Sequence, residues 1–122
     1  MLPRLFLSLG FLLVLGGATA KAEGDAAHGQ EIYESRCIAC HSVEANRVGP
    51  RHRGVFGRPA GSLSDYTYSK ALKAARFTWD AETLDRWLTN PQAFVPGQKM
   101  NFKVNDPQDR ADLIAYLKTL SQ

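Results

Sequence analysis

The sequence predicts a small all-α domain, and three observations support this. Four segments have the apolar spacing and end signals of helices, no two segments alternate like paired strands, and two long Gly/Pro loops intervene. The chain has 122 residues, enough for one domain. Such loops are unusual in so small a domain unless they pack on something, and a large buried ligand would account for both.

The first 22 residues predict a secretory signal peptide rather than part of the domain. Arg4 precedes a run at residues 5–17 that is apolar except for Ser8, and small-x-small sites end at Ala20 and Ala22. We expect cleavage after Ala22, with Ala20 as the alternative, leaving residues 23–122 as the domain. The other reading is an uncleaved membrane anchor, but the run is shorter than the ~18 residues that a spanning helix needs.

The net charge argues against a nucleic-acid partner. The full chain has 15 basic and 12 acidic side chains, a net charge of +3. Cleavage after Ala22 removes Arg4 and Lys21, which leaves 13 basic and 12 acidic side chains and a net charge of +1. No basic run remains that would suit nucleic acid.

The first helix is predicted over residues 25–40. Asp25 can cap it by accepting backbone N–H bonds. Gly29, Tyr33 and Cys37 lie four residues apart and share one face. A glycine inside a helix costs ~1 kcal/mol relative to alanine. Either another helix crosses closely at Gly29 or the helix simply tolerates it, and the residues alone leave both open.

The second and third helices are predicted over residues 69–75 and 80–91. Ser69 and Asp80 are their capping residues, and Asn90-Pro91 ends the third helix. The apolar stripe of the third helix consists of Leu84, Trp87 and Leu88.

The fourth helix is predicted over residues 105–120. Asp106 caps it, Pro107 takes the first helical position and Asp109 adds a negative charge to the first turn. Its strongly amphipathic apolar face consists of Leu113, Ile114, Leu117 and Leu120.

The motif Cys37-Ile38-Ala39-Cys40-His41 indicates covalent haem attachment. Two cysteines three apart on a helical turn can add their thiols to neighbouring vinyl groups, and the following histidine can meet the iron. A redox dithiol ranks below this, because such a pair begins a helix in a βαβ setting that is missing from the pattern. A zinc site ranks last, because only His28 and His52 remain as further ligands.

The second axial ligand of such an iron could be histidine, methionine or water. Met1 leaves with the signal peptide, so Met100 is the only methionine of the mature chain. It lies in a polar Pro-Gly loop at residues 95–100 rather than on an apolar stripe. Ligation by His41 and Met100 would close the site, which favours electron transfer over substrate chemistry.

Over residues 24–120 the chain resembles class I cytochrome c, the mitochondrial and bacterial cytochrome c2 type. The resemblance is carried by CIACH, VGPRHRGVFGR, Tyr66-Thr67-Tyr68, Phe77-Thr78-Trp79, LTNPQAFVPGQKM and DLIAYLK. It implies three to five helices wrapped around one haem c that is bound covalently through Cys37 and Cys40. It also implies that the terminal helices cross, with Gly29 and Tyr33 packed near Tyr116.

The resemblance also implies roles for individual residues. The Pro50 carbonyl would accept a hydrogen bond from His41, and Met100 would be the sixth iron ligand. Tyr68 and Trp79 would bind a haem propionate. The implied cofactor-binding residues are Cys37, Cys40, His41, Pro50, Arg58 (which would offset propionate charge), Tyr68, Trp79, Trp87, Met100 and Phe102 (which would cover the haem edge). The implied metal ligands are His41 and Met100.

Some positions depart from the family pattern. Trp87 replaces a tyrosine that usually hydrogen-bonds the methionine sulfur, Gln98 replaces a threonine and Leu72 replaces an asparagine. Around the haem edge, Arg36, Lys99 and Lys103 fit the usual basic ring, whereas Gln92 and Asp106 stand where lysines are common. We therefore expect weaker electrostatic steering to acidic partners than in the mitochondrial protein.

These observations predict a soluble periplasmic monohaem carrier of single electrons, not an enzyme. The expected partners are redox proteins: a cytochrome bc1-type donor, a terminal oxidase, a photosynthetic reaction centre or a periplasmic dehydrogenase. We expect a monomer with no membrane span after signal removal. The alternatives are a dedicated acceptor for one periplasmic dehydrogenase, or a haem peroxidase or gas sensor in which Met100 is off the iron.

Overall fold

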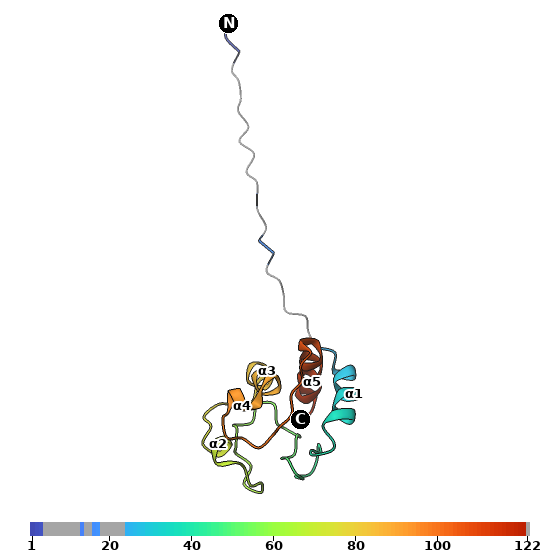
Figure 1. Ribbon diagram of the computed structural model, residues 1–122. Coiled ribbons are helices and arrows are strands. Elements are labelled where there is room, and N and C mark those ends of the chain that lie inside the picture. The colour runs from blue at the N-terminus through green and yellow to red at the C-terminus, as the bar shows by residue number, and fades with distance from the viewer. Residues whose placement is uncertain (4–12, 14–15, 18–23, 122) are drawn as a thin grey trace.

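The computed structural model describes residues 1–3, 13, 16–17 and 24–121 (Figure 1). The predicted signal peptide and its cleavage sites lie mostly outside these residues. Within the described part of the chain, no helix is both long and apolar enough to cross a membrane.

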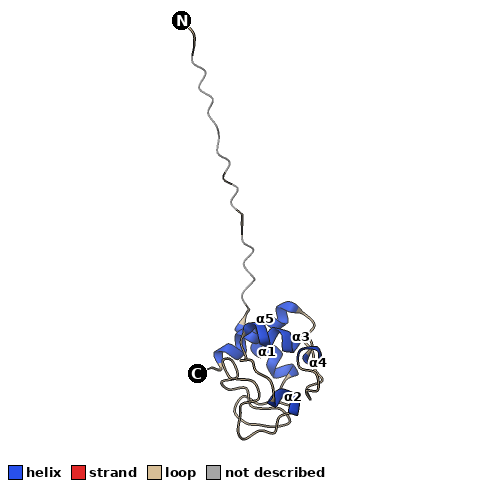
Figure 2. Ribbon diagram, turned by 90° about the vertical axis from the view of Figure 1, so that its left-hand side faces the viewer, coloured by secondary structure: helices blue, strands red, loops and turns tan. Residues whose placement is uncertain are grey.

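The described residues form an all-α domain, as predicted. The helices are α1 (Ala26–Arg36), α2 (Lys70–Lys73), α3 (Ala81–Thr89), α4 (Pro91–Phe94) and α5 (Pro107–Thr119). Long loops make up the rest of the domain (Figure 2). The β-type pairing among the described residues is a single isolated bridge between Pro59 and Thr78.

Side-chain caps begin the four predicted helices. Asp25, Ser69, Asp80 and Asp106 each accept backbone N–H bonds from the first turn that follows them. These bonds satisfy donors that have no partner inside the helix. At α3 the cap is reciprocal, because the Thr83 hydroxyl also accepts from the Asp80 backbone N–H at 2.8 Å.

Two predicted boundaries were wrong. The first helix ends at Arg36 rather than at residue 40, and Cys37 is its C-cap. The predicted Pro-Gly loop at residues 92–105 is not wholly irregular either, because α4 covers its first residues. Asn90 ends α3 and also caps α4, in which Pro91 takes the first position. Proline suits that position because its missing N–H would have no partner there.

Helices α1 and α5 cross closely at Gly29, as the resemblance implied, which answers the question that the residues alone left open. A Cβ at Gly29 would overlap the Asp112 carbonyl and lie 2.9 Å from the Tyr116 Cβ. One helical turn later, the rings of Tyr33 and Tyr116 pack 5.3 Å apart between centroids. Figure 1 shows α1 and α5 side by side, with α3 and α4 across the domain.

Gly29→Ala should therefore destabilise the domain. Alanine has the better helix propensity by ~1 kcal/mol, so an open site would gain stability. Overlap with the α5 backbone should reverse the sign and cost about 1–3 kcal/mol. Denaturant unfolding of the holoprotein checks this, with Glu31→Ala at an exposed position of α1 as the control. A stabilised Gly29→Ala variant would contradict the close crossing.

A second contact between α1 and α5 is a hydrogen-bonded ion pair. The His28 Nδ1 lies 2.6 Å from one carboxylate oxygen of Asp112. The other oxygen accepts from the Asp25 backbone N–H at 2.7 Å and from the Gln108 amide at 2.9 Å. The bond to Asp112 raises the pKa of His28 above 6.5. The Asp25 N–H, followed by His28, lowers the pKa of Asp112 below 3.8.

This pair predicts a pH-dependent stability. The His28 contribution is full below pH 6.5 and is lost as the pH rises through its raised pKa. The Asp112 contribution is present above pH 3.8 and is lost as the pH falls through its lowered pKa. The ion pair between His28 and Asp112 therefore stabilises the folded state most between pH 3.8 and pH 6.5. The measurement is the free energy of unfolding at pH 5.5 and pH 8 for the parent and His28→Gln, because other titrating groups cancel in the difference. Equal pH dependence of the two proteins would contradict it.

The apolar faces of α3 and α5 form the core, as predicted. Leu113 and Leu117 of α5 and Leu84 and Leu88 of α3 are all buried, with Leu113 only 1% exposed. An ion pair of 2.8 Å between Arg110 and Asp85 joins the same two helices at their edge. The core leaves a large space between these helices and the loops.

Candidate functional site

The domain encloses a cavity of about 430 Å³, within the range of about 300–1,000 Å³ typical of cofactor sites. Its walls come from α1, α3, α5 and both long loops. All ten sequence-predicted site residues line it: Cys37, Cys40, His41, Pro50, Arg58, Tyr68, Trp79, Trp87, Met100 and Phe102. One concave site thus collects residues from nearly the whole domain.

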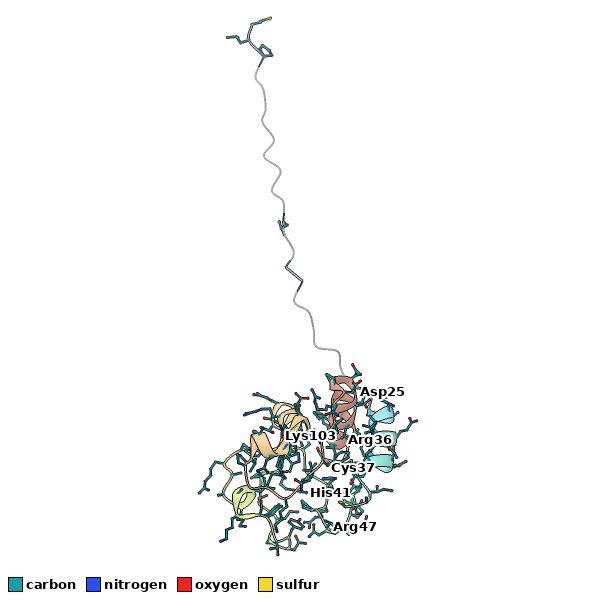
Figure 3. All side chains as sticks on the ribbon, viewed as in Figure 1. Asp25, Arg36, Cys37, His41, Arg47 and Lys103 are labelled. Atoms are coloured by element: carbon teal, nitrogen blue, oxygen red, sulfur yellow. The ribbon has the colours of Figure 1, made fainter. Side chains whose placement is uncertain are left out.

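The CIACH motif forms a hydrogen-bonded turn directly after α1. The backbone N–H groups of Cys40 and His41 both donate to the Cys37 carbonyl, at 3.2 and 2.9 Å. The Cys40 carbonyl accepts from the Gly49 N–H at 2.9 Å, so the following loop folds back on the motif. Figure 3 shows Cys37 and His41 below the end of α1. The turn brings both thiols and the imidazole to one cavity wall.

A hydrogen bond orients the His41 ring in the way that is usual for a neutral, metal-binding imidazole. Its Nδ1 lies 2.9 Å from the Pro50 carbonyl, which leaves the other ring nitrogen available for a metal. Burial lowers the pKa of His41, although the Pro50 bond partly opposes this. Gly49 lies so close that a Cβ there would overlap the ring carbon Cε1. The position therefore has room only for glycine.

The thiols do not have the character of a redox dithiol. Burial raises the pKa of Cys37 to about 11, whereas a reactive dithiol needs a thiolate stabilised near neutral pH. The motif also follows a helix rather than beginning one.

A zinc site is not supported either. Among the described residues, the one group of three or more potential metal-ligating side chains is His28, Asp109 and Asp112, which contains neither cysteine. Its His28 and Asp112 are already joined by the ion pair between α1 and α5, and Arg36 lies 3.6 Å from Asp109.

Met100 lies in a loop that is fixed by its own hydrogen bonds. The Gln98 side chain is 7% exposed and accepts a bond from the Met100 backbone N–H. The Gln98 backbone N–H donates to the Val95 carbonyl at 3.1 Å. Gln98 thus stabilises the backbone beside Met100.

The other predicted residues line the cavity in different ways. Trp79 is 7% exposed and packs edge to face against Trp87, with 5.2 Å between the rings. The Tyr68 hydroxyl accepts from the Leu63 N–H at 3.1 Å. Arg58 donates to the Arg51 and Arg53 carbonyls at 3.0 and 2.6 Å, so its guanidinium is held in place. Phe102 is 37% exposed and lies where the cavity meets the surface.

The sequence did not predict that two further residues would contact the ring of His41. These are Gly49, which approaches His41 as described above, and His52, which was considered only as a zinc ligand. The glycine directly before Pro50 was a usable signal, since close backbone approach is a common reason for glycine. His52 gave no such signal, because its place depends on how the loop folds back.

The site suits a covalently attached haem. It combines a mainly apolar cavity with two thiols, a neutral imidazole and a thioether, which is a donor set used for haem c. Arg58, Tyr68 and Trp79 line the cavity and supply the polar groups that the two haem propionates would need. The residues present therefore fit the group that the motif indicates.

Comparison with known proteins agrees with this donor set. A family model described as cytochrome c matches residues 26–121. The cytochrome c of Euglena viridis is 45% identical over 100 residues, covering 80% of this chain and 98% of that protein. The cytochrome c2 of Rhodomicrobium vannielii is 45% identical over 106 residues, covering 84% of each chain.

A solved structure agrees as well. Cytochrome cH from Methylobacterium extorquens superposes with a TM-score of 0.75 at 47% sequence identity, covering 79% of this chain and 99% of that one. Together with the matched residues and the cavity, these similarities establish that the chain belongs to the cytochrome c family: a monohaem electron carrier with one covalently bound haem c, not an enzyme, that works with redox protein partners.

Proposed function

We propose that this cytochrome c carries single electrons in the periplasm with His41 and Met100 as the two axial iron ligands. The observation that supports it best is that one cavity contains Cys37, Cys40, His41 and Met100, although Met100 lies 59 positions after His41. The remaining predicted cofactor-binding residues line the same cavity.

The chain's own residues would keep the site unchanged between redox states. Bound haem supplies a one-electron iron couple. His41 is oriented by the Pro50 carbonyl, and the bond makes its imidazole more basic. The Gln98 side chain fixes the backbone beside Met100. His41 and Met100, both on hydrogen-bonded loops, would hold the iron with the chain's own side chains, so no ligand position would remain for a substrate.

Redox partners would dock where the cavity reaches the surface. Cys40 and Phe102 line the cavity and are exposed, and Ile38 is 49% exposed beside them in sequence. Of the basic groups expected there from the sequence, Arg36 and Lys99 line the cavity, and the exposed Lys103 directly follows Phe102 in the chain. A modest positive charge of this kind would steer acidic partners weakly, with a rate that falls as salt is added.

The periplasmic location depends on the predicted signal peptide. The intact mass of the protein purified from a bacterial expression host decides it. A mass of residues 23–122 plus one haem supports export and cleavage after Ala22. A mass of the full chain would overturn the signal-peptide assignment.

An optical redox titration of the purified holoprotein tests the axial pair. We expect a single one-electron transition, a low-spin ferric spectrum and a far-red charge-transfer band from Met100. A high-spin ferric spectrum that binds cyanide or CO rapidly would instead favour a peroxidase or gas sensor and overturn the proposal.

A further inference from the structure

His52 contributes a partly buried imidazole that none of the roles above uses. Its ring stacks on that of His41, with centroids 4.1 Å apart and an angle of 22° between the planes. The backbone sets this position, because the His52 N–H donates to the Ser42 carbonyl at 3.1 Å and the Arg53 N–H to the Val43 carbonyl at 2.8 Å. These two bonds hold the segment at residues 42–43, directly after His41, beside the segment at residues 52–53 that carries His52.

Tyr33 of α1 holds the same ring from another direction. The Tyr33 hydroxyl lies 2.9 Å from the His52 Nδ1, and the two rings meet edge to face at 5.5 Å. Tyr33 itself is 2% exposed and packs on Tyr116 of α5. A continuous set of contacts thus runs from the crossing of α1 and α5 to the ring of His41.

The Tyr33 hydroxyl and the His52 Nδ1 are hydrogen-bonded to each other. Polar groups shielded from water need hydrogen-bond partners, and in this part-buried contact the Tyr33 hydroxyl and the His52 Nδ1 are each other's partner. This pairing, together with the backbone bonds at residues 52 and 53, holds the ring of His52 against that of His41.

The bond to the Pro50 carbonyl does not by itself fix the plane of the His41 ring. A single hydrogen bond at Nδ1 opposes a full rotation about the Cβ–Cγ bond, but the broad geometry that such bonds tolerate still allows small turns of the ring plane. Gly49 limits the approach near Cε1. A flat ring stacked at 22° removes the remaining rotation, because any turn of His41 would drive its edge into the face of His52.

We propose that His52, held by Tyr33, is a positioning residue that fixes the plane of the His41 imidazole and adds a polar group beside it. This rests on the proposed ligation of the iron by His41. Outer groups that orient a ligating histidine commonly tune its metal. Here the orienting group is an aromatic plane, which acts in addition to the Pro50 carbonyl.

The test compares His52→Leu, His52→Phe and Tyr33→Phe in the ferric holoprotein. The paramagnetically shifted NMR signals of the haem methyl groups report the plane of the axial imidazole. We expect His52→Leu to change the order or spread of these signals and His52→Phe to restore the parent order, because phenylalanine keeps the flat ring. Tyr33→Phe should give a smaller change than His52→Leu, and Tyr116→Phe, which leaves the Tyr33 hydroxyl in place, is the matched control with none.

The midpoint potential gives a second readout that packing alone would not produce. Both His52→Leu and His52→Phe remove a polar group beside the ligand, which disfavours the more positive ferric state. Both potentials should therefore rise above the parent's, although only His52→Leu alters the methyl pattern. If His52→Leu does not accumulate, His52→Phe and Tyr33→Phe decide the question by the same two readouts.

Parent-like methyl signals in both His52→Leu and Tyr33→Phe, or an unchanged potential in His52→Phe, would overturn the proposal. The parent spectrum tests the axial pair, whereas the difference between parent and variant tests His52. Either proposal can therefore fail without the other.

Discussion

The double variant Cys37→Ser, Cys40→Ser should yield almost no folded holoprotein. Both thiols lie at the wall of the 430 Å³ cavity and form the covalent link to haem. If that space were left empty, at about 24 cal/mol per Å³ it would cost on the order of 10 kcal/mol. Small domains are stable by only about 5–15 kcal/mol in total. The haem is therefore as important to folding as the rest of the core.

The loss should be visible in two independent measurements. Covalent haem is measured from the absorption of the denatured, pyridine-treated protein, and folding from the far-UV circular dichroism of the purified chain. Cys40→Ser alone should keep a single covalent bond through Cys37 and retain partial holoprotein, which serves as the matched control. A double variant with parent-like helix content and no haem would show that the core is sufficient without the cofactor.

Helix starts could be predicted because their causes are local. Asp25, Asp80 and Asp106 accept bonds from N–H groups within the next three residues, so each signal lies within one short window. The amphipathic face of α5 is local in the same sense. Its period of 3.6 residues repeats over three turns and identifies the buried leucines without knowledge of what they contact.

The errors have causes that lie outside such a window. Beyond the early end of α1, the Cys40 carbonyl accepts from the Gly49 N–H, nine residues later in the chain, rather than from a following helical turn. Helix α4 is a single turn, too short to show any period, and Asn90-Pro91 was interpreted only as a stop. That pair can end one helix and begin the next, because Asn90 caps α4 and Pro91 needs no N–H partner.

The site was predicted where residues carry their chemistry in a motif. CIACH specifies its own spacing, and Met100 stood out as the one methionine of the chain besides Met1. Local spacing could not decide the role of Gly29, and only the family resemblance implied its packing near Tyr116, because the need for glycine there comes from the α5 backbone about 83 positions later. The place of His52 could not be predicted either, since its stack on His41 follows from the pairing of residues 42–43 with 52–53.

Met100→Ala should leave haem attached but remove the far-red band and lower the midpoint potential. The two cysteines attach haem without help from Met100, so the holoprotein should still form. Thioether ligation favours ferrous iron, and its loss leaves water or another weak ligand in that position. The measurement is an optical redox titration of parent and variant under identical conditions, combined with the ferric spectrum in the far red.

The control for Met100→Ala must disturb the loop without removing the sulfur. Gln98→Ala does this, because the Gln98 side chain accepts from the Met100 N–H but offers no thioether. It should keep the far-red band and lose only stability, since a buried Gln98 that is 7% exposed leaves a small void when truncated. If Met100→Ala keeps the band, another residue ligates the iron. If both variants lose the band, Met100 binds the iron only when the Gln98 side chain holds its backbone in place.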